Sequence, residues 1–319
     1  MGWKPGVLAI VGPTAVGKTD LAVGLCQRRA AEIVVADSRQ VYKGLDIASN
    51  KPTAGQRAKA RFHMIDVADP RIVYSAADYV RDATQAIAQI HGEGHLAIVE
   101  GGTGLYVDAL LGGLALAGVE PCSRLRQDLA EVASTPDGLA QLWAELAAVD
   151  PDLAASIDAN NPRRIIRAIE IWRSTGIPPS HLRTRTAPRS DVVWVGLTAA
   201  RDSLYRRSDD RVALQLSLGV VAQAKEQLEA GVDPGAPAMT AVGCREPVQM
   251  LSGEIGAEDL VGAMRRGTRR FIRRQLIWSR RNPAVTWIDV TSLSTEGAIE
   301  VIDEFLPAMV SGTGQIGAR

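Results

Sequence analysis

The feature that most constrains the fold is a glycine-rich segment of the pattern G-x-x-x-x-G-K-[ST], set between a predicted strand and a predicted helix. It consists of Gly12, Pro13, Thr14, Ala15, Val16, Gly17, Lys18 and Thr19, after the apolar run 7–11 and before a helical pattern over 18–29. In this context the glycines let backbone N–H groups converge on phosphate oxygens, and the helix N-terminus adds partial positive charge. We therefore predict a phosphate-binding loop rather than an ordinary turn, with Lys18 reaching the phosphates and Thr19 ligating Mg²⁺.

The rest of the chain alternates between strand-like and helix-like segments. Apolar runs predict strands at 33–36, 96–99, 191–197 and 285–290, and helical patterns occur at 76–91, 202–230 and 258–281. This alternation predicts an α/β fold whose parallel sheet is covered by helices on both faces. Residues 122–172 are helical without a strand, so we expect an α-helical insertion. The expected division is a core of 1–115 and 190–310 that ends in helices, an insertion of 116–189 and a flexible tail of 311–319.

The charge balance limits how the chain can bind a polyanion. It has 36 basic and 36 acidic residues, so a nucleic acid can be attracted only by charge that is segregated onto one face. Cys26, Cys122 and Cys244 lack the spacing of a zinc site or a disulfide framework, which favours reduced thiols. Without a signal-peptide pattern or an apolar run of about 20 residues, we expect a cytoplasmic protein that does not enter a membrane.

Polar residues follow two of the predicted strands. Asp37 comes directly after the strand at 33–36, and Gly101, Gly102 and Thr103 follow the strand at 96–99. The carboxyl ends of parallel strands face the ligand crevice of an open α/β sheet, so both groups should lie beside the phosphate loop. By itself, Asp37 is better explained as a turn or helix-capping residue. The two polar strand ends together favour the edge of an active site.

The chain resembles the tRNA dimethylallyltransferases, also called tRNA isopentenyltransferases. The matching segments occur in the family's order at 12–19, 37–47, 74–79, 101–106, 161–168, 241–243 and 268–278. The most specific are Asp-Ser-x-Gln-x-Tyr at 37–42 and Arg-Gln-x-x-Trp at 274–278. The resemblance implies a P-loop NTPase-like parallel sheet flanked by helices, with a helical insertion that binds tRNA.

The resemblance also implies a reaction, in which a dimethylallyl group moves from dimethylallyl diphosphate to N6 of adenosine 37 in the anticodon stem-loop of tRNA. The phosphate loop and Mg²⁺ would then stabilise a diphosphate leaving group. By the family pattern Asp37 is the general base, Thr103 touches the tRNA substrate, and Ser38, Arg39 and Gln40 lie beside the extruded base. We expect a monomer.

Further positions carry over from the family's tRNA-contacting segments. They are Arg163, Arg164, Ile165, Ile166 and Arg167, and Thr240, Ala241, Val242, Gly243, Cys244 and Arg245. Arg126 is the preferred contact in the insertion, with Arg124 as the alternative, and Arg211 resembles an Arg that could close over the diphosphate. Cys244 replaces the usual Tyr, and Phe271-Ile272-Arg273 replaces the usual Tyr-Ala-Lys, so the details of tRNA contact can differ here.

Six arginines form a stripe near the end of the chain. Arg265, Arg269 and Arg273 make one row at four-residue spacing, and Arg266, Arg270 and Arg274 make the adjacent row. On a helix the two rows share one face, and no acidic residue lies between them in the sequence. Contact with phosphate backbone, above all by Arg266 and Arg270, is the favoured interpretation. The alternatives are pairing with acids elsewhere in the fold and binding of the diphosphate, for which Arg274 is the candidate.

Three other functions share part of this pattern. A P-loop nucleotide kinase would have the phosphate loop but no need of Arg-Gln-x-x-Trp. An enzyme that prenylates free AMP or ADP would share the core but have less use for the arginines of the insertion. An RNA-binding protein with a vestigial loop would not need Lys18, Thr19 and Asp37 intact.

Overall fold

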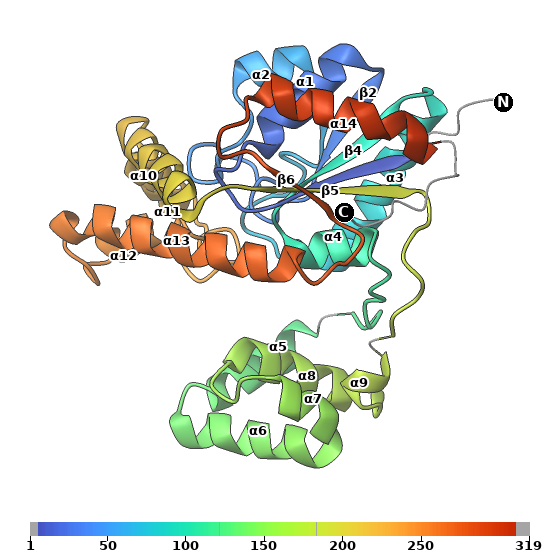
Figure 1. Cartoon of the computed structure of the whole chain (residues 1–319). Helices are drawn as coiled ribbons and strands as arrows, with labels where there is room; N and C mark the ends of the chain where they lie inside the picture. Colours follow the sequence, from blue (N-terminus) through green and yellow to red (C-terminus); the bar gives the residue numbers. More distant parts are fainter. Residues whose placement is uncertain (1–5, 121, 183, 311–319) are drawn as a thin grey trace. The chain divides into compact units, whose positions relative to one another are not determined.

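A parallel six-stranded sheet forms the centre of the larger of two compact units in the computed structural model, which describes residues 6–120, 122–182 and 184–310. The strands are β1 (Val7–Val11), β2 (Ala31–Val35), β3 (Phe62–His63), β4 (Leu96–Gly101), β5 (Val192–Thr198) and β6 (Thr286–Asp289). Their order is β3-β2-β4-β1-β5-β6, so β1 lies between β4 and β5 (Figure 1). The predicted tail of 311–319 lies outside the described residues.

Helices cover both faces of this sheet. Those of the larger unit are α1 (Lys18–Arg28), α2 (Ala54–Lys59), α3 (Ala76–Gly92), α4 (Gly104–Leu110), α10 (Arg201–Ser217), α11 (Val220–Glu229), α12 (Arg245–Leu251), α13 (Leu260–Ser279) and α14 (Thr295–Val310), with a 3₁₀ turn η1 at Ala257–Asp259. Figure 1 shows α1 and α14 on one face and α3 and α4 on the other. All five residues of β1 are buried, as a strand covered on both faces requires.

The helical stretch predicted at 202–230 is present, but it is divided into two helices. The structure has α10 and α11 there, separated at Gly219, which adopts a left-handed conformation with φ of 89°. That conformation suits a glycine and interrupts the helical hydrogen bonds. None of the described helices is both long and apolar enough to cross a membrane.

The second unit, residues 111–188, is helical and has its own apolar core. It contains α5 (Ser123–Val132), α6 (Pro136–Val149), α7 (Pro151–Ser156), α8 (Pro162–Thr175) and α9 (Pro179–Leu182). Its two ends run antiparallel through a bridge of Leu114 with Arg185, and the N–H of Thr186 donates to Gly113 O at 2.8 Å. The segment Asn161-Pro162 starts α8, because the Asn161 side chain accepts the N–H of Arg164 and Pro162 occupies the first helical position.

A buried carboxylate, Glu170 of α8, joins three parts of the helical unit. Its Oε2 lies 2.8 Å from guanidinium nitrogens of Arg126 and Arg167, and its Oε1 accepts the N–H of Cys122 at 2.8 Å. Burial alone would raise the pKa of Glu170, but the hydrogen bonds from Arg167, Arg126 and Cys122 lower it below the ordinary value. The carboxylate is therefore held in its charged form by two of the arginines predicted to meet tRNA.

We expect Glu170→Gln to destabilise the protein by about 1–3 kcal/mol at pH 7, because the amide cannot replace the charged hydrogen bonds. Since the folded pKa is lowered, this contribution is full above about pH 4.3 and is lost as the pH falls through the folded pKa. Urea unfolding of both proteins from pH 7 down to about pH 3 measures the difference and its loss in acid.

The matched control is Glu145→Gln, which breaks a more exposed pair with Arg173 in the same unit. It should cost no more than about 1 kcal/mol. An equal loss for both variants would contradict the special role of Glu170.

Candidate functional site

The loop between β1 and α1 is shaped to present backbone N–H groups. Gly12 has φ of 143°, and a Cβ there would lie 2.5 Å from the carbonyl oxygen of Leu197 in β5, so no larger residue fits. Gly17, with φ of 102°, precedes α1 and makes no side-chain cap, which leaves the first N–H groups of the helix available. Lys18 Nζ donates to Pro13 O at 2.8 Å and folds back over the loop.

A carboxylate that the sequence analysis did not single out, Glu100, lies beneath this loop. It is the buried penultimate residue of β4, and Thr19 Oγ1 donates to its Oε1 at 3.1 Å. Burial raises the pKa of Glu100, and the charge of Lys18 and the hydrogen bond from Thr19 pull it down only in part. An acidic residue closing an apolar strand next to the phosphate-loop strand was the available signal.

The same burial acts on Lys18. Desolvation lowers the pKa of this ammonium, and the charge of Arg211 lowers it further, while Glu100 and Asp37 oppose the change. Two carboxylates thus share one buried ammonium. Oxygen ligands such as the Thr19 hydroxyl and the Glu100 carboxylate are those that Mg²⁺ prefers, and an added cation would relieve the incomplete compensation of Glu100. These residues therefore fit a magnesium ion.

Asp37 lies at the carboxyl end of β2, as predicted. One of its oxygens, Oδ1, accepts the N–H of Arg39 at 2.8 Å, so the turn-forming role is real. Within the described residues, Oδ2 has no hydrogen-bond partner and can accept a proton. Thr103 joins this turn to the end of β4, because its Oγ1 accepts the N–H of Ser38 at 2.9 Å and its N–H donates to Ala36 O at 3.1 Å.

The segment 240–245 lies against the turn that follows Asp37. The Arg39 guanidinium donates to Pro237 O just before the segment, and Gly243, with φ of 96°, lies close to Ala48 O. Ala241 and Cys244 are buried, so their side chains contribute packing, whereas Thr240, Val242 and Arg245 are partly exposed. Cys244, which replaces the usual Tyr, is therefore a core residue, and burial raises the pKa of its thiol to about 12.

Gln275 of α13 connects the phosphate loop with the end of β4. Its Oε1 accepts the N–H of Thr14 at 2.8 Å, and its Nε2 donates to Gly102 O at 3.2 Å. A Cβ at Gly102 would collide with this amide, and a Cβ at Gly104 would collide with the ring of Trp278. The Arg-Gln-x-x-Trp segment thus packs two side chains against glycines of the segment 101–106.

Arg211 of α10 also reaches the phosphate loop, where its guanidinium donates to Thr14 Oγ1 at 3.0 Å. Burial lowers the pKa of this guanidinium, and Asp20 and Glu100 oppose the change. A pocket on this flank is lined by the loop residues Ala15, Val16 and Gly17 and by Arg207 and Arg211. The prediction that Arg211 lies near the bound diphosphate is consistent with this position.

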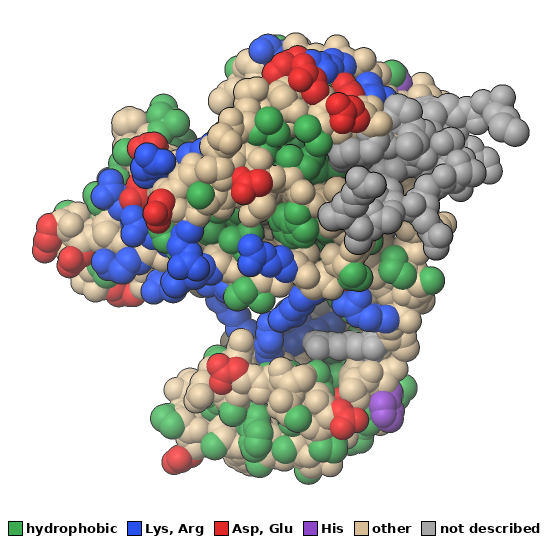
Figure 2. All heavy atoms as spheres, viewed as in Figure 1, with side chains coloured by type: hydrophobic (Ala, Val, Ile, Leu, Met, Phe, Trp, Pro, Cys, Tyr) green, Lys and Arg blue, Asp and Glu red, His purple; other side chains and the backbone are tan. Residues whose placement is uncertain are grey.

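The arginine stripe lies on α13, and its two rows differ in their partners. Arg269 donates to Asp209 of α10 at 2.6 Å and Arg265 lies 3.8 Å from the same carboxylate. For Arg266 and Arg270, both exposed, there is no acidic partner among the described residues. Figure 2 shows Lys and Arg side chains gathered on the surface over α13. The pKa of Arg274 is lowered by burial and by the charges of Arg245 and Arg270, so several basic groups lie close together here.

The predicted contacts of the helical unit divide into exposed and buried groups. Arg163 and Arg164 are exposed at the start of α8, whereas the side chains of Ile165 and Ile166 belong to the core of the unit and are not free to meet a ligand. Arg126 and Arg167 are partly exposed while paired with Glu170.

A second group of possible metal ligands, Glu32, Glu93 and His95, lies at the amino ends of the strands, away from the phosphate loop. Glu32 is already engaged, with His63 Nε2 at 2.6 Å, His95 Nδ1 at 2.8 Å and the Arg61 guanidinium at 3.5 Å. Arg61 also lies 3.4 Å from Glu93 and supplies the positive charge that a metal would bring. The carboxylates of this cluster are therefore already paired with cationic or hydrogen-bonding groups, and no metal ion is needed to balance them.

Comparison with known proteins agrees with these features. The family model described as "IPP transferase" matches residues 40–282. The chain is 46% identical over 288 residues to a tRNA dimethylallyltransferase of Thermomicrobium roseum, covering 90% of this chain and 87% of the relative. It is 41% identical over 294 residues to one from Roseiflexus sp., covering 92% and 96%.

Solved structures show the same similarity. The full-length tRNA isopentenylpyrophosphate transferase of Bacillus halodurans aligns with a TM-score of 0.72 at 36% identity, over 97% of each chain. A eukaryotic dimethylallyltransferase described as acting on tRNA aligns with a TM-score of 0.77 at 26% identity, over 95% of this chain and 80% of that one.

Proposed function

The chain belongs to the IPP transferase family, and we propose that it transfers a dimethylallyl group from dimethylallyl diphosphate to N6 of adenosine 37 of tRNA, with release of diphosphate. The observation that carries the proposal is the meeting of the phosphate loop, the Asp37 carboxylate and the Gln275 amide at one edge of the sheet. A diphosphate held by the loop would present its organic group toward a base beside Asp37.

In the proposed reaction, N6 forms a bond with C1 of the dimethylallyl group while the bond from C1 to the diphosphate oxygen breaks. The N6 proton moves to Asp37, whose Oδ2 is open while Oδ1 is fixed by the N–H of Arg39. The leaving diphosphate gains negative charge, which Lys18, Arg211 and the loop N–H groups are placed to stabilise. Mg²⁺ held by Thr19 and Glu100 would add to this stabilisation.

The tRNA side of the reaction needs a base that has left the stack and a surface that holds the backbone. Extrusion of the base would make its N6 accessible to the Asp37 carboxylate. The residues that form or contact the turn after Asp37 are Ser38, Arg39, Gln40 and Thr103. The open row of arginines on α13 supplies charge for phosphates in a protein of zero net charge. Both the loop and the base-facing turn come from one chain, which supports a monomer as the active species.

The test of this function is incubation with dimethylallyl diphosphate and either unmodified tRNA or AMP, followed by analysis of the nucleosides. We expect N6-prenyl adenosine only from tRNA, and Asp37→Asn should lower kcat by about 10²–10⁴-fold, because an amide of the same size cannot take the proton. Affinity for tRNA should stay near that of the wild type. Near wild-type single-turnover rates would rule out Asp37 as the base, and product from AMP alone would favour a free-nucleotide prenyltransferase.

A second prediction concerns magnesium. EDTA should abolish activity, and Mg²⁺ should restore it, because Thr19 and Glu100 offer the oxygen ligands beside the diphosphate. Thr19→Ala and Glu100→Gln should each raise the Mg²⁺ concentration needed for half-maximal rate, whereas Thr19→Ser keeps the hydroxyl and should behave like the wild type. Activity that survives thorough chelation would contradict the proposed metal role.

The arginine stripe gives a prediction about salt. Arg266→Gln combined with Arg270→Gln should weaken tRNA binding, and each arginine–phosphate interaction that is removed should reduce the slope of log K against log salt by roughly 0.7–0.9. Affinity for dimethylallyl diphosphate should barely change, because the phosphate loop is intact. Filter binding at several salt concentrations measures both effects.

The matched control is the double change of Arg265 and Arg269 to Gln, which removes the same charge from residues that pair with Asp209. Its slope should stay closer to that of the wild type. If both double variants keep the wild-type slope, the stripe has a structural role.

A further inference from the structure

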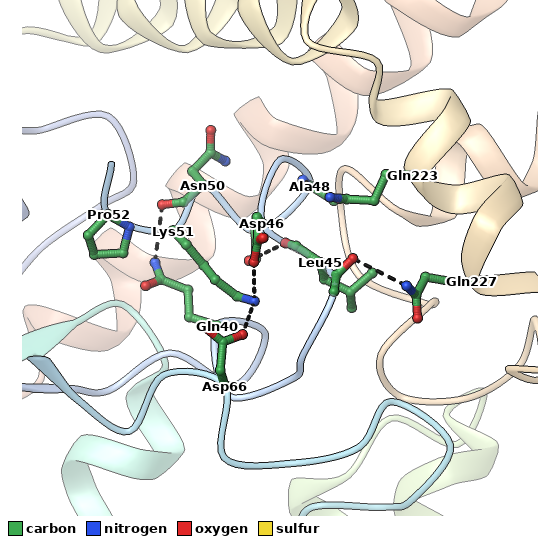
Figure 3. A network of polar contacts seen from close by, with 12 residues as sticks. Gln40, Leu45, Asp46, Ala48, Asn50, Lys51, Pro52, Asp66, Gln223 and Gln227 are labelled. Carbon is green, nitrogen blue, oxygen red and sulfur yellow. Dashed lines mark hydrogen bonds and ion pairs between the residues drawn. The ribbon is translucent and has the colours of Figure 1, made fainter. Parts of the chain in front are cut away.

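One buried cation outside the phosphate loop remains unexplained by the reaction. The side chain of Lys51 is 1% exposed, and its Nζ lies 2.5 Å from Asp46 Oδ1 and contacts Asp66 Oδ1 (Figure 3). Removing an ammonium from water costs free energy unless the ammonium is paired. A buried, paired lysine in a surface loop is therefore a candidate for a structural or functional role. Pro52 follows directly and favours an extended backbone at Lys51. This restriction limits the directions in which the Lys51 side chain can leave the backbone.

Lys51 joins two loops whose backbones are strained. Asn50, Met64 and Asp66 all have positive φ, of 52°, 66° and 60°, although none is a glycine. Such conformations persist where the surrounding contacts over-determine them, and they are concentrated at functional sites. The ion pairs of Lys51 tie the loop 46–51 to the loop 64–66 and supply that constraint.

Gln40 lies between these two loops, at the end of the segment 37–40. Its carbonyl oxygen accepts the N–H of Asp66 at 3.1 Å, and its side-chain Nε2 donates to Asn50 O at 3.5 Å. Its side-chain Oε1 is buried and has no hydrogen-bond partner among the described residues. An unpaired buried amide oxygen is costly, which points to a ligand that completes it.

Glutamines of α10 and α11 hold the first loop from the other side. Gln215 Nε2 donates to Ile47 O and Ala48 O at 3.1 and 3.0 Å, and Gln223 Oε1 accepts the N–H of Ala48 at 3.0 Å. Figure 3 shows Gln223 and Gln227 directed at this loop and Lys51 between Asp46 and Asp66. The loop is thus fixed on both sides, and the Oε1 of the neighbouring Gln40 remains without a partner among the described residues.

We propose that Lys51 is a positioning residue that acts through Gln40 and holds the Gln40 Oε1 as an acceptor for an N–H group of a nucleobase in the bound tRNA. This inference rests on the proposed transfer to tRNA. Lys51 itself touches no substrate: its charge fixes the two loops that carry the partners of Gln40. The acceptor selects a base edge that carries a donor, as the amino group of adenine does.

A double-mutant cycle of Lys51→Met and Gln40→Leu tests this coupling. Asp46 and Asp66 are 64% and 32% exposed, so both carboxylates stay hydrated without Lys51, and Met fills the space of the buried stem. We expect Lys51→Met to lower kcat/KM for tRNA about tenfold, with the KM for dimethylallyl diphosphate changed less than about twofold. In the Gln40→Leu background, the same change should lower kcat/KM by less than about threefold.

The control is Arg57→Gln, which loses an exposed pair with Asp66 and a hydrogen bond to Pro52 O. Among the described residues Arg57 makes no hydrogen bond or ion pair with Lys51 or Gln40. Arg57→Gln should behave like the wild type. Asp66→Asn weakens the ion pair with Lys51 with little change of shape, and it should show a smaller coupling to Gln40→Leu of the same sign. This variant tests the proposal even if Lys51→Met folds poorly.

Three outcomes would overturn the proposal. Effects of Lys51→Met and Gln40→Leu that multiply independently would show that Lys51 does not act through Gln40. An equal loss of affinity for dimethylallyl diphosphate would show a general structural role. A wild-type protein that prenylates no tRNA would refute the proposed function itself, and this inference with it.

Discussion

The side-chain amide of Gln275 is the contact on which the arrangement of the site depends. One amide carries both a donor and an acceptor, and here it satisfies the N–H of Thr14 and the carbonyl of Gly102 at once. Both partners are backbone groups in a partly buried place. Through this residue α13 sets the distance between the phosphate loop and the end of β4, and the same helix carries the open arginines on its surface.

The charged groups of the site also interact closely with one another. The charges of Glu100, Arg211 and Asp37 all act on the pKa of Lys18, and the charges of Lys18 and Asp37 act on the pKa of Glu100. Burial strengthens these interactions by excluding water. The positive groups point at the loop, and Asp37 keeps one oxygen open at the next strand end. Groups that are fixed in this way before a substrate binds do not need to reorganise when charge develops during the reaction.

Local features of this fold were predictable from the sequence, and distant pairings were not. The strand at 7–11 and the loop after it are predictable because a short apolar run and a glycine pattern are local features of the sequence. The two-residue strand β3 is too short to show a period, and Gly219 within a helical pattern does not by itself indicate a break. From the sequence, Lys51 would be predicted to be exposed to solvent, because it lies in a loop before a proline and its spacing from Asp46 and Asp66 does not indicate burial.

The functional arginines show the same limit. The resemblance indicates Arg126 and Arg167, but their shared partner Glu170 is 44 residues from one of them and is visible only in the fold. Glu100 is ambiguous in the sequence for a different reason, because a carboxylate at the end of a strand also serves to end an apolar run.

The paired ends of the helical unit have a consequence for how this chain folds. Because Gly113 and Thr186 are hydrogen-bonded neighbours, the folded insertion is, for the rest of the protein, a short connection between α4 and β5. Its apolar core is built from one continuous stretch, so it can fold as soon as that stretch has been synthesised. Folding of the insertion shortens the connection between β4 and β5. It therefore lowers the entropic cost of closing this loop before β5 pairs with β1.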